Sequence, residues 1–193
     1  MAGRREEKKQ AVRQAIYDAA LRLIERDGYD AVSVTDITRD VGIAKGTFFN
    51  HFPAKADILA AWYETLIADY LAAQSPQDDL VDSLLELTMG IGRLTRQYPE
   101  MWRAKNIEAA RSQSLRDVEQ DTDRQVAARI ADLLRRSALP EQAPGPEHLA
   151  DLILALATGT WREAMVTEQL DTAPDRMRQR LQTLLGTIGA CQA

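Results

Sequence analysis

The sequence predicts an all-α protein of about nine helices. Apolar residues recur every three or four positions in the long segments, and no alternating apolar pattern extends beyond four residues. Prolines and glycines divide the chain into pieces of helix length. With 193 residues, 45% of them hydrophobic and 27% charged, the chain can bury a core of its own, which excludes a disordered chain or a small disulfide scaffold.

The single cysteine, Cys191, excludes an intramolecular disulfide and a cysteine metal cluster, and it favours a reducing compartment. The longest apolar run covers residues 152–157, whereas a membrane span needs about 20 residues. The charged N-terminus has no apolar stretch behind it and so does not resemble a secretory signal. We therefore expect a cytoplasmic protein with no membrane partner.

An apolar stripe from Val12 to Ile24 predicts the first long helix, which should stop at Gly28 because glycine after a charged last turn favours a helix end. Residues 139–146 are too rich in proline and glycine to be helical, so they predict a loop. Further stripes predict helices that begin near Leu80, Val126, Leu149 and Met177.

Two short helices between these long segments are the most informative part of the chain. Ser33 followed by Asp36 predicts a capping box at the start of the first, and Gly42 allows the left-handed backbone that ends it. The second would run over about 44–52, just before Pro53. Two short helices joined by a tight glycine turn predict a helix-turn-helix, whose second helix lies in the DNA major groove.

Charge is distributed unevenly along the chain. The net charge is -5, yet residues 1–55 hold 10 Lys and Arg against 8 Asp and Glu, and the remaining residues hold 14 against 21. Such asymmetry between parts of a chain is a hint of nucleic-acid binding, although a solvated basic tail is the alternative. The basic residues nearest the N-terminus are Arg4, Arg5, Lys8 and Lys9.

The stretch from Val12 to Leu59 resembles the DNA-binding domain of the TetR family of transcriptional regulators. It covers about a quarter of the chain, and the remainder is similar to the family only in length and helix layout. The residues that carry the resemblance are Ile16, Ala19, Ala20, Leu23, Gly28, Tyr29, Ser33, Val34, Ile37, Val41, Gly42, Lys45, Gly46, Thr47, Phe49, His51, Phe52, Lys55 and Leu59.

The resemblance implies a DNA-binding surface near 33–55, with base or phosphate contacts from the second short helix and phosphate contacts from its flanks. It also implies that the N-terminal arm follows the DNA backbone or enters the minor groove. The expected DNA-binding residues are Ser33, Thr35, Ala44, Lys45, Gly46, Thr47, Phe49, Asn50, His51 and Lys55.

Two positions depart from the family pattern. The family usually has a tyrosine at the position of Phe49, so a phosphate contact through a hydroxyl is lost there. It often has alanine at the position of Thr38, whose hydroxyl we expect to bond locally. Phe48 and Phe52 are expected to be core residues.

We expect residues 1–55 to form the DNA-binding domain and residues 56–193 a ligand-binding and dimerisation domain. The segment 149–157 is apolar nearly all round, so it should be buried on two sides, one of them against a second subunit. The resemblance implies a homodimer built on the last two helices. Its expected interface residues are Leu152, Leu156, Met177, Leu181, Leu184, Leu185 and Ile188.

The resemblance also implies a cavity in the C-terminal domain for a small molecule, which we expect to be apolar or aromatic because tryptophan and methionine are among its candidate liners. The alternative that each of them is an ordinary core or surface residue stays open. The candidates are Met89, Arg93, Trp102, Asn106, Trp161 and Met165.

These expectations together describe a dimeric, ligand-responsive transcriptional repressor that binds a palindromic DNA operator and is released by the small molecule. An alternative is a small-molecule-binding or enzymatic helical module without a DNA role, and a further one is an activator or ligand-independent regulator. No nucleophile, base and orienting acid can be assembled from the sequence, and the acidic residues of 117–123 lack the glycine and glutamate of a calcium loop. We therefore expect no enzyme activity, no cofactor and no metal.

Overall fold

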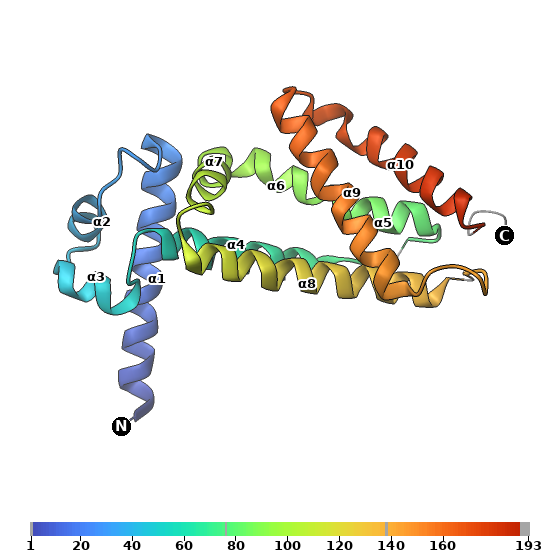
Figure 1. Cartoon of the computed structure of the whole chain (residues 1–193). Coiled ribbons are helices and arrows are strands. Elements are labelled where there is room, and N and C mark those ends of the chain that lie inside the picture. Colours follow the sequence, from blue (N-terminus) through green and yellow to red (C-terminus); the bar gives the residue numbers. More distant parts are fainter. Residues whose placement is uncertain (1, 76, 138, 190–193) are drawn as a thin grey trace. The chain divides into compact units, whose positions relative to one another are not determined.

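The computed structural model describes residues 2–75, 77–137 and 139–189, and in these ranges it contains helices and no strands. The all-α prediction is confirmed, whereas Cys191 lies outside the described residues. The elements are α1 (Ala2–Asp27), α2 (Val34–Val41), α3 (Lys45–His51), α4 (Ala56–Ala73), α5 (Leu80–Met89), α6 (Ile91–Gln97), α7 (Pro99–Glu108), α8 (Gln113–Arg136), α9 (Pro146–Val166), the 3-10 helix η1 (Leu170–Thr172) and α10 (Ala173–Thr187) (Figure 1).

The helices pack into two compact units. The first contains residues up to 65 together with 95–119, and the second contains 66–94 together with the residues from 120 onward. These packing units differ from the division at residue 55 that the sequence suggests, because α7 packs on α1 and stays with the N-terminal helices. The expected boundary therefore remains an expectation about function rather than about packing.

In the first unit, α1 packs against α2 and α7 (Figure 1). Its apolar stripe is buried as predicted, with Ile16 and Ile24 fully inaccessible to solvent. The helix ends at Asp27, and Gly28 follows with a φ of 85°, as the sequence predicts. The carboxylate of Glu25 on α1 accepts the backbone N–H of Met101 at 2.8 Å, so α1 caps the first turn of α7.

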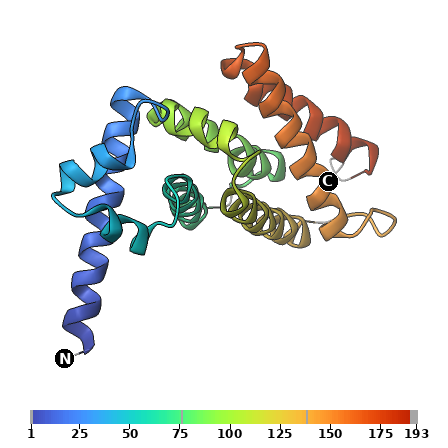
Figure 2. The same ribbon diagram turned by 60° about the vertical axis from the view of Figure 1, so that its left-hand side comes forward.

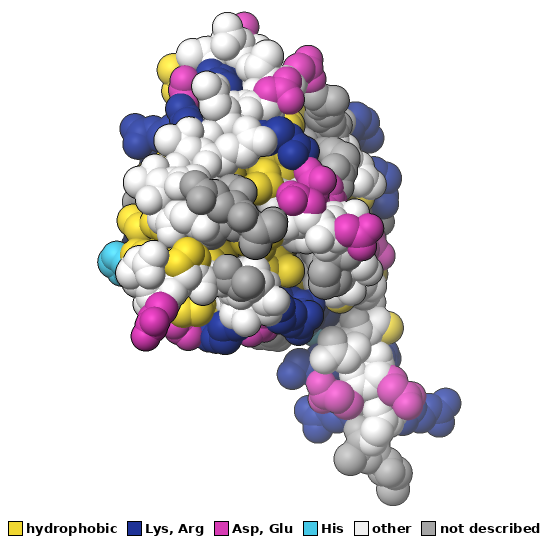
Figure 3. Space-filling model, turned by 90° about the vertical axis from the view of Figure 1, so that its right-hand side faces the viewer, with side chains coloured by type: hydrophobic (Ala, Val, Ile, Leu, Met, Phe, Trp, Pro, Cys, Tyr) yellow, Lys and Arg dark blue, Asp and Glu magenta, His cyan; other side chains and the backbone are white. Residues whose placement is uncertain are grey.

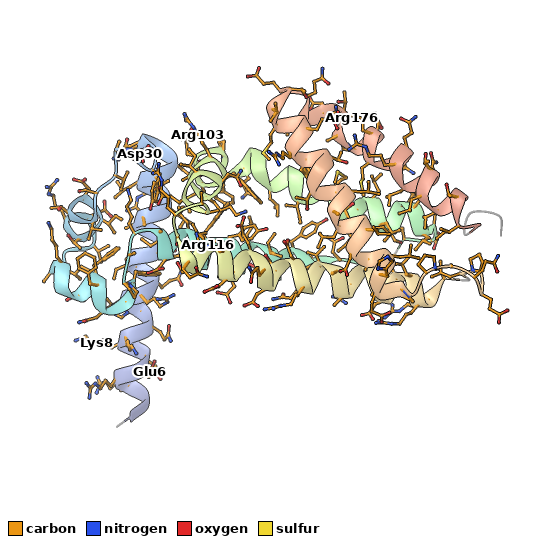
Figure 4. The ribbon with its side chains drawn as sticks, viewed as in Figure 1. Glu6, Lys8, Asp30, Arg103, Arg116 and Arg176 are labelled. Atoms are coloured by element: carbon orange, nitrogen blue, oxygen red, sulfur yellow. The ribbon has the colours of Figure 1, made fainter. Side chains whose placement is uncertain are left out.

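The first turns of α1 are helical rather than an extended arm. The helix starts at Ala2, and its residues 4–10 are exposed. Arginine, glutamate, lysine and glutamine are good helix formers, which explains why the apolar stripe can be preceded by a polar extension of the same helix. Figure 3 shows basic and acidic side chains around this extension, two of which, Glu6 and Lys8, are labelled in Figure 4.

In the second unit, α5, α9 and α10 pack around a core that includes Leu84 and Ile153. The indole N–H of Trp161 donates to the carbonyl of Thr88 at 3.0 Å. A side chain at Gly92 would come within 1.6 Å of the Trp161 ring, so only glycine fits below this tryptophan. No helix in the described ranges combines the length and apolar character needed to cross a bilayer.

Helices α4 and α8 lie side by side and run in the same direction, as Figures 1 and 2 both show. In the first unit, the hydroxyl of Ser114 donates to the carboxylate of Asp57 at 2.6 Å, joining the starts of the two helices. In the second unit, Arg129 donates to the carbonyl of Leu71 at 3.1 Å. Each unit thus holds its own part of this helix pair.

Candidate nucleic-acid interface

The turn between α2 and α3 has the geometry that its sequence predicts. Ser33 accepts the backbone N–H of Asp36 at 3.2 Å, and the Asp36 carboxylate accepts the backbone N–H of Ser33 at 3.0 Å, completing the capping box. The hydrogen bonds from Ser33 lower the pKa of Asp36. At the other end Gly42 has a φ of 75°, and its N–H donates to the carbonyl of Thr38. This left-handed residue turns the chain toward α3.

Helix α3 is held by its buried aromatic residues. Phe48 and Phe52 are essentially inaccessible, as predicted, and their ring centroids lie 6.1 Å apart. Arg13 of α1 closes the end of α3: its guanidinium donates to the carbonyl of His51 at 2.5 Å and lies 4.1 Å from the Phe52 ring centroid. Two phenylalanines of α3 and its end, together with Arg13 from 38 positions before His51, therefore fix the direction of a helix of only seven residues.

The outer face of α3 is largely open to solvent in the described part of the structure. Lys45, Gly46 and Asn50 are exposed, and Phe49 keeps 47% of its surface in solvent. A Cβ atom at Gly46 would meet nothing within 4 Å, so packing within the chain does not explain this glycine. Ala44 is also exposed, while Thr47 and His51 are half-buried at the edge of the same face. The arrangement leaves a convex, accessible helix face of the size that a DNA major groove admits.

The residues at the start of α2 are partly engaged. Ser33 is exposed but uses its hydroxyl in the capping box, and Thr35 is half-buried. Thr38 is buried and donates to the carbonyl of Thr35 at 3.1 Å, which confirms the expected local hydrogen bond. These bonds stabilise the first helix of the motif without using the exposed face of α3.

Lys55 has a structural role in the free chain that the sequence did not indicate. Its ammonium donates to the carbonyls of Tyr29 at 2.7 Å and Val32 at 2.9 Å, and it lies 3.7 Å from the Tyr29 ring centroid. Burial lowers the pKa of the Lys55 ammonium and raises that of the Tyr29 phenol. Lys55 thus fastens the loop between α1 and α2 to the start of α4, and a phosphate contact would have to share its ammonium.

The expected ligand residues are distributed over both units. In the second unit Met89 is buried, Trp161 is bonded to Thr88, and Met165 is 47% exposed. The side chain of Arg93 lies outside the described part of the structure, although its backbone belongs to α6. In the first unit Asn106 is exposed, whereas the half-buried Trp102 packs among other aromatic rings.

A pocket of about 600 Å³ lies in the first unit, between the end of α1 and α7. Charged residues surround it, among them Asp30 and Arg103, which Figure 4 labels. Ile107 adds an exposed apolar wall. None of the six expected ligand residues lines this pocket, and sequence periodicity gives no sign of it because its walls come from distant segments.

The expected interface residues of α9 and α10 fall into two groups. Met177, Leu181 and Leu185 are fully buried within the single chain, where α10 packs on α5 and α9. The others reach the surface, and hydrophobic side chains are visible among polar ones on the face drawn in Figure 3. The residues that reach the surface are Leu152, which is 41% exposed, and the half-buried Leu156, Leu184 and Ile188.

A capped helix, a left-handed glycine turn and a second helix with an exposed polar face define a helix-turn-helix DNA-binding protein. Residues 16–62 match the family model of the bacterial regulatory proteins of the tetR family. The HTH-type transcriptional regulator BetI of Agrobacterium fabrum is 25% identical over 170 residues, which cover 84% of this chain and 79% of that protein.

Solved structures agree with this assignment. A transcriptional regulator from Rhodococcus sp. Rha1 has the same fold, with a TM-score of 0.65 and 21% identity over 89% of this chain and 96% of that chain. A putative transcriptional regulator from Saccharomonospora viridis, solved in complex with choline, gives a TM-score of 0.61 and 26% identity over 92% and 96% of the two chains. The chain is a transcriptional regulator of the TetR family.

Proposed function

We propose that this regulator is a homodimeric repressor that binds a palindromic operator through α3 and its flanks, and that a small molecule releases it. The observation that carries the proposal is the outer face of α3. Lys45, Gly46 and Asn50 lie exposed on a helix whose opposite face is anchored by Phe48. Lysine and asparagine can bond phosphates and base edges, and glycine lets the helix backbone come close to DNA.

The dimer follows from the geometry of DNA. Two recognition helices read successive major-groove faces when they are about 34–36 Å apart, and a twofold dimer presents them to a palindrome. The apolar residues that α9 and α10 leave at the surface supply a face for the second subunit. Acting on chromosomal DNA, the dimer would work in the cytoplasm.

The small molecule would favour a conformation in which the two recognition helices are wrongly spaced. Coupling of this kind is typically about 1–3 kcal/mol, which changes operator affinity roughly 5–150-fold. Helix α4 is the element through which the change would pass, since it begins directly after α3 and continues from the first unit into the second. The S. viridis relative was solved with choline, which supports a small-molecule effector for this chain as well.

The test is a gel shift of the full chain on the DNA upstream of its own gene, at two salt concentrations and with competitor DNA. A specific complex should weaken steeply with salt, because each phosphate contact releases counterions. Lys45→Ala should reduce operator affinity about tenfold and lower the salt slope by about one unit, while the dimer persists. A Lys45→Ala protein with unchanged operator affinity would show that α3 is not the reading helix.

If the protein does not bind the upstream fragment, the next experiment is selection of binding sites from random DNA. Recovery of a palindromic site there would support the proposal with a distant operator. Failure of both experiments would contradict DNA binding and favour a helical ligand-binding module.

A further inference from the structure

Four aromatic rings form a cluster inside the first unit, away from the outer face of α3. Trp62 and Tyr63 come from α4, Tyr98 immediately precedes α7, and Trp102 lies on α7. Trp102 makes edge contacts with Trp62 at 5.5 Å and with Tyr63 at 5.6 Å, and Trp62 meets Tyr98 at 6.1 Å. Rings that meet edge to face leave some of their electron-rich faces directed at other groups.

A lysine ammonium lies against two rings of this cluster. Lys105 lies one helical turn after Trp102 on α7, and only 5% of the residue is exposed. Its Nζ atom lies 4.2 Å from the centroid of the Tyr63 ring and 5.7 Å from that of Trp102. It also forms an ion pair with the carboxylate of Glu119 on α8.

Burial of the Lys105 ammonium has a free-energy cost. A buried ammonium gives up its hydration, and the ion pair with Glu119 and the two ring faces offset that cost only in part. The cluster is therefore built to hold a positive charge, and in the free chain Lys105 supplies it.

A second observation points to a ligand. The indole N–H of Trp102 is buried and has no hydrogen-bond acceptor among the described residues. Buried N–H groups in proteins are nearly always bonded, so an unbonded one beside an aromatic cluster indicates an acceptor that arrives from outside. This N–H belongs to a ring that the Lys105 ammonium faces.

We infer that the cluster of Trp62, Tyr63, Tyr98 and Trp102 is the effector site, and that it takes a small organic cation bearing a hydrogen-bond acceptor. The cation displaces the Lys105 ammonium from the rings and lies near the Glu119 carboxylate, while its acceptor oxygen receives the Trp102 N–H. Quaternary ammonium groups suit the site best, because they bind ring faces and are weakly hydrated. This inference rests on the proposed function for its regulatory consequence.

The structural change caused by displacement of Lys105 would be transmitted to the DNA-binding helices through contacts inside the first unit. The Lys105–Glu119 pair joins α7 to α8. Helix α7 is fastened to α1 by the bond from Met101 to Glu25, and α8 is fastened to the start of α4 by the bond from Ser114 to Asp57. Breaking the ion pair lets α7 and α8 shift separately, and each of them supports a different helix beside the helix-turn-helix.

The test is calorimetric titration of the full chain, without DNA, using choline, tetramethylammonium and dimethylbutanol, the neutral carbon isostere of choline. Both cations should bind, and the neutral isostere should bind at least about tenfold more weakly than choline, because the rings select the charge rather than the shape. Equal binding of choline and its isostere, or no binding of either cation, would overturn the inference.

Two variants separate the roles of Lys105 and Trp102. Lys105→Met keeps the apolar stem and removes the competing ammonium, so tetramethylammonium should bind about tenfold more tightly than to the wild type. Trp102→Phe keeps a ring and removes the N–H, so choline should bind more weakly while tetramethylammonium is less affected. Tyr70→Phe, in the second unit, is the matched control, because it also keeps a ring and removes a donor, the hydroxyl that bonds the carbonyl of Glu86, and it should change neither affinity.

Unchanged tetramethylammonium affinity in a folded Lys105→Met protein would contradict the displacement of Lys105. If Lys105→Met does not fold, the Trp102→Phe variant tests the site instead. An equal loss of affinity for choline and for tetramethylammonium in that variant would contradict the hydrogen bond from the Trp102 N–H to the ligand. These titrations need no operator, so a failed gel shift would leave a positive result for the cation site intact. Conversely, specific operator binding by a protein that binds neither cation would support the proposed function and contradict the cation site.

Discussion

The guanidinium of Arg13 lies over the ring of Phe52, 4.1 Å from its centroid. The same group donates to the backbone carbonyl of His51, which is the last residue of α3. A seven-residue helix has little stability of its own, since isolated helices shorter than about 12 residues are marginal in water. The position of the reading helix therefore depends on a side chain of α1.

Removal of this side chain should cost both stability and DNA binding. Arg13→Ala abolishes the cation–π contact and the charge-assisted hydrogen bond, which together contribute about 1–2 kcal/mol. We expect a lower urea midpoint and a weaker operator complex, although Arg13 need not touch DNA. Urea unfolding followed by circular dichroism, with a gel shift on the same protein, measures both effects.

Arg22 provides the matched control for Arg13. It also lies on α1 and also contacts the helix-turn-helix, through an ion pair with Asp40, but the side chains of that pair are 58% and 36% exposed. Exposed ion pairs contribute at most about 1 kcal/mol. Arg22→Ala should therefore change stability little, and an equal loss in the two variants would mean that the Phe52 contact is not the cause.

Gly46→Ala should separate folding from DNA binding. A Cβ at this position meets open space in the free chain, and alanine in a helix is more favourable than glycine by up to about 1 kcal/mol. The protein should thus be as stable as the wild type or slightly more stable. If the backbone of Gly46 approaches DNA closely, operator affinity should fall about tenfold or more, because the added methyl group meets the DNA backbone.

Gly186 is a second helical glycine whose Cβ would meet nothing within 4 Å, and it lies on α10. Gly186→Ala should produce the same small stabilisation with no change in operator affinity. An unchanged gel shift for Gly46→Ala would remove the close backbone approach from the proposal, and a loss in both variants would point to a general effect of the substitution.

The helix-turn-helix could be predicted from sequence because its determinants are local. The capping box uses residues three positions apart, and the left-handed turn needs only one glycine at Gly42. Phe48 and Phe52 follow the helical period and are buried as that period predicts. Each of these features is decided within a few residues, so the sequence pattern carries the necessary information.

The contacts that position the motif could not be predicted in this way. Arg13 and His51 are 38 positions apart, and Lys55 lies 26 positions from the carbonyl of Tyr29 that it binds. No periodic pattern encodes such pairs, since they arise only when helices meet in space. The grouping of α7 with α1 has the same origin, because it depends on the bond between Glu25 and Met101 and on packing between distant segments.

The contact between α9 and α10 should depend on pH. Glu163 of α9 accepts hydrogen bonds from Arg180 at 2.6 Å and Arg176 at 3.1 Å, and these arginines lower its pKa, with the Arg180 bond as the largest cause. A lowered pKa in the folded state means that the stabilisation is complete above the ordinary pKa of glutamate, about 4.3, and is lost as the pH falls through the lowered value.

Glu163→Gln should therefore be less stable than the wild type at neutral pH and should approach it at acidic pH, where the wild-type carboxyl is protonated. Urea unfolding at a series of pH values measures this convergence. Glu141→Gln, in the exposed loop before α9, is the control and should follow the wild type throughout. A stability difference for Glu163→Gln that is independent of pH would assign the effect to packing instead of charge.

The proposed dimer predicts a strong effect at Leu152, which is 41% exposed on α9 in the single chain. Leu152→Glu would place a carboxylate in the apolar face between subunits, and the twofold axis would place it there twice, so the dimer dissociation constant should rise roughly 100-fold. Sedimentation velocity should then show monomers, and operator affinity should fall because one subunit spans one half-site. Ile107→Glu is the control, since Ile107 is similarly exposed but lies on α7 in the first unit. Persistence of the Leu152→Glu dimer, or equal dissociation of both variants, would show that the subunits associate through another surface.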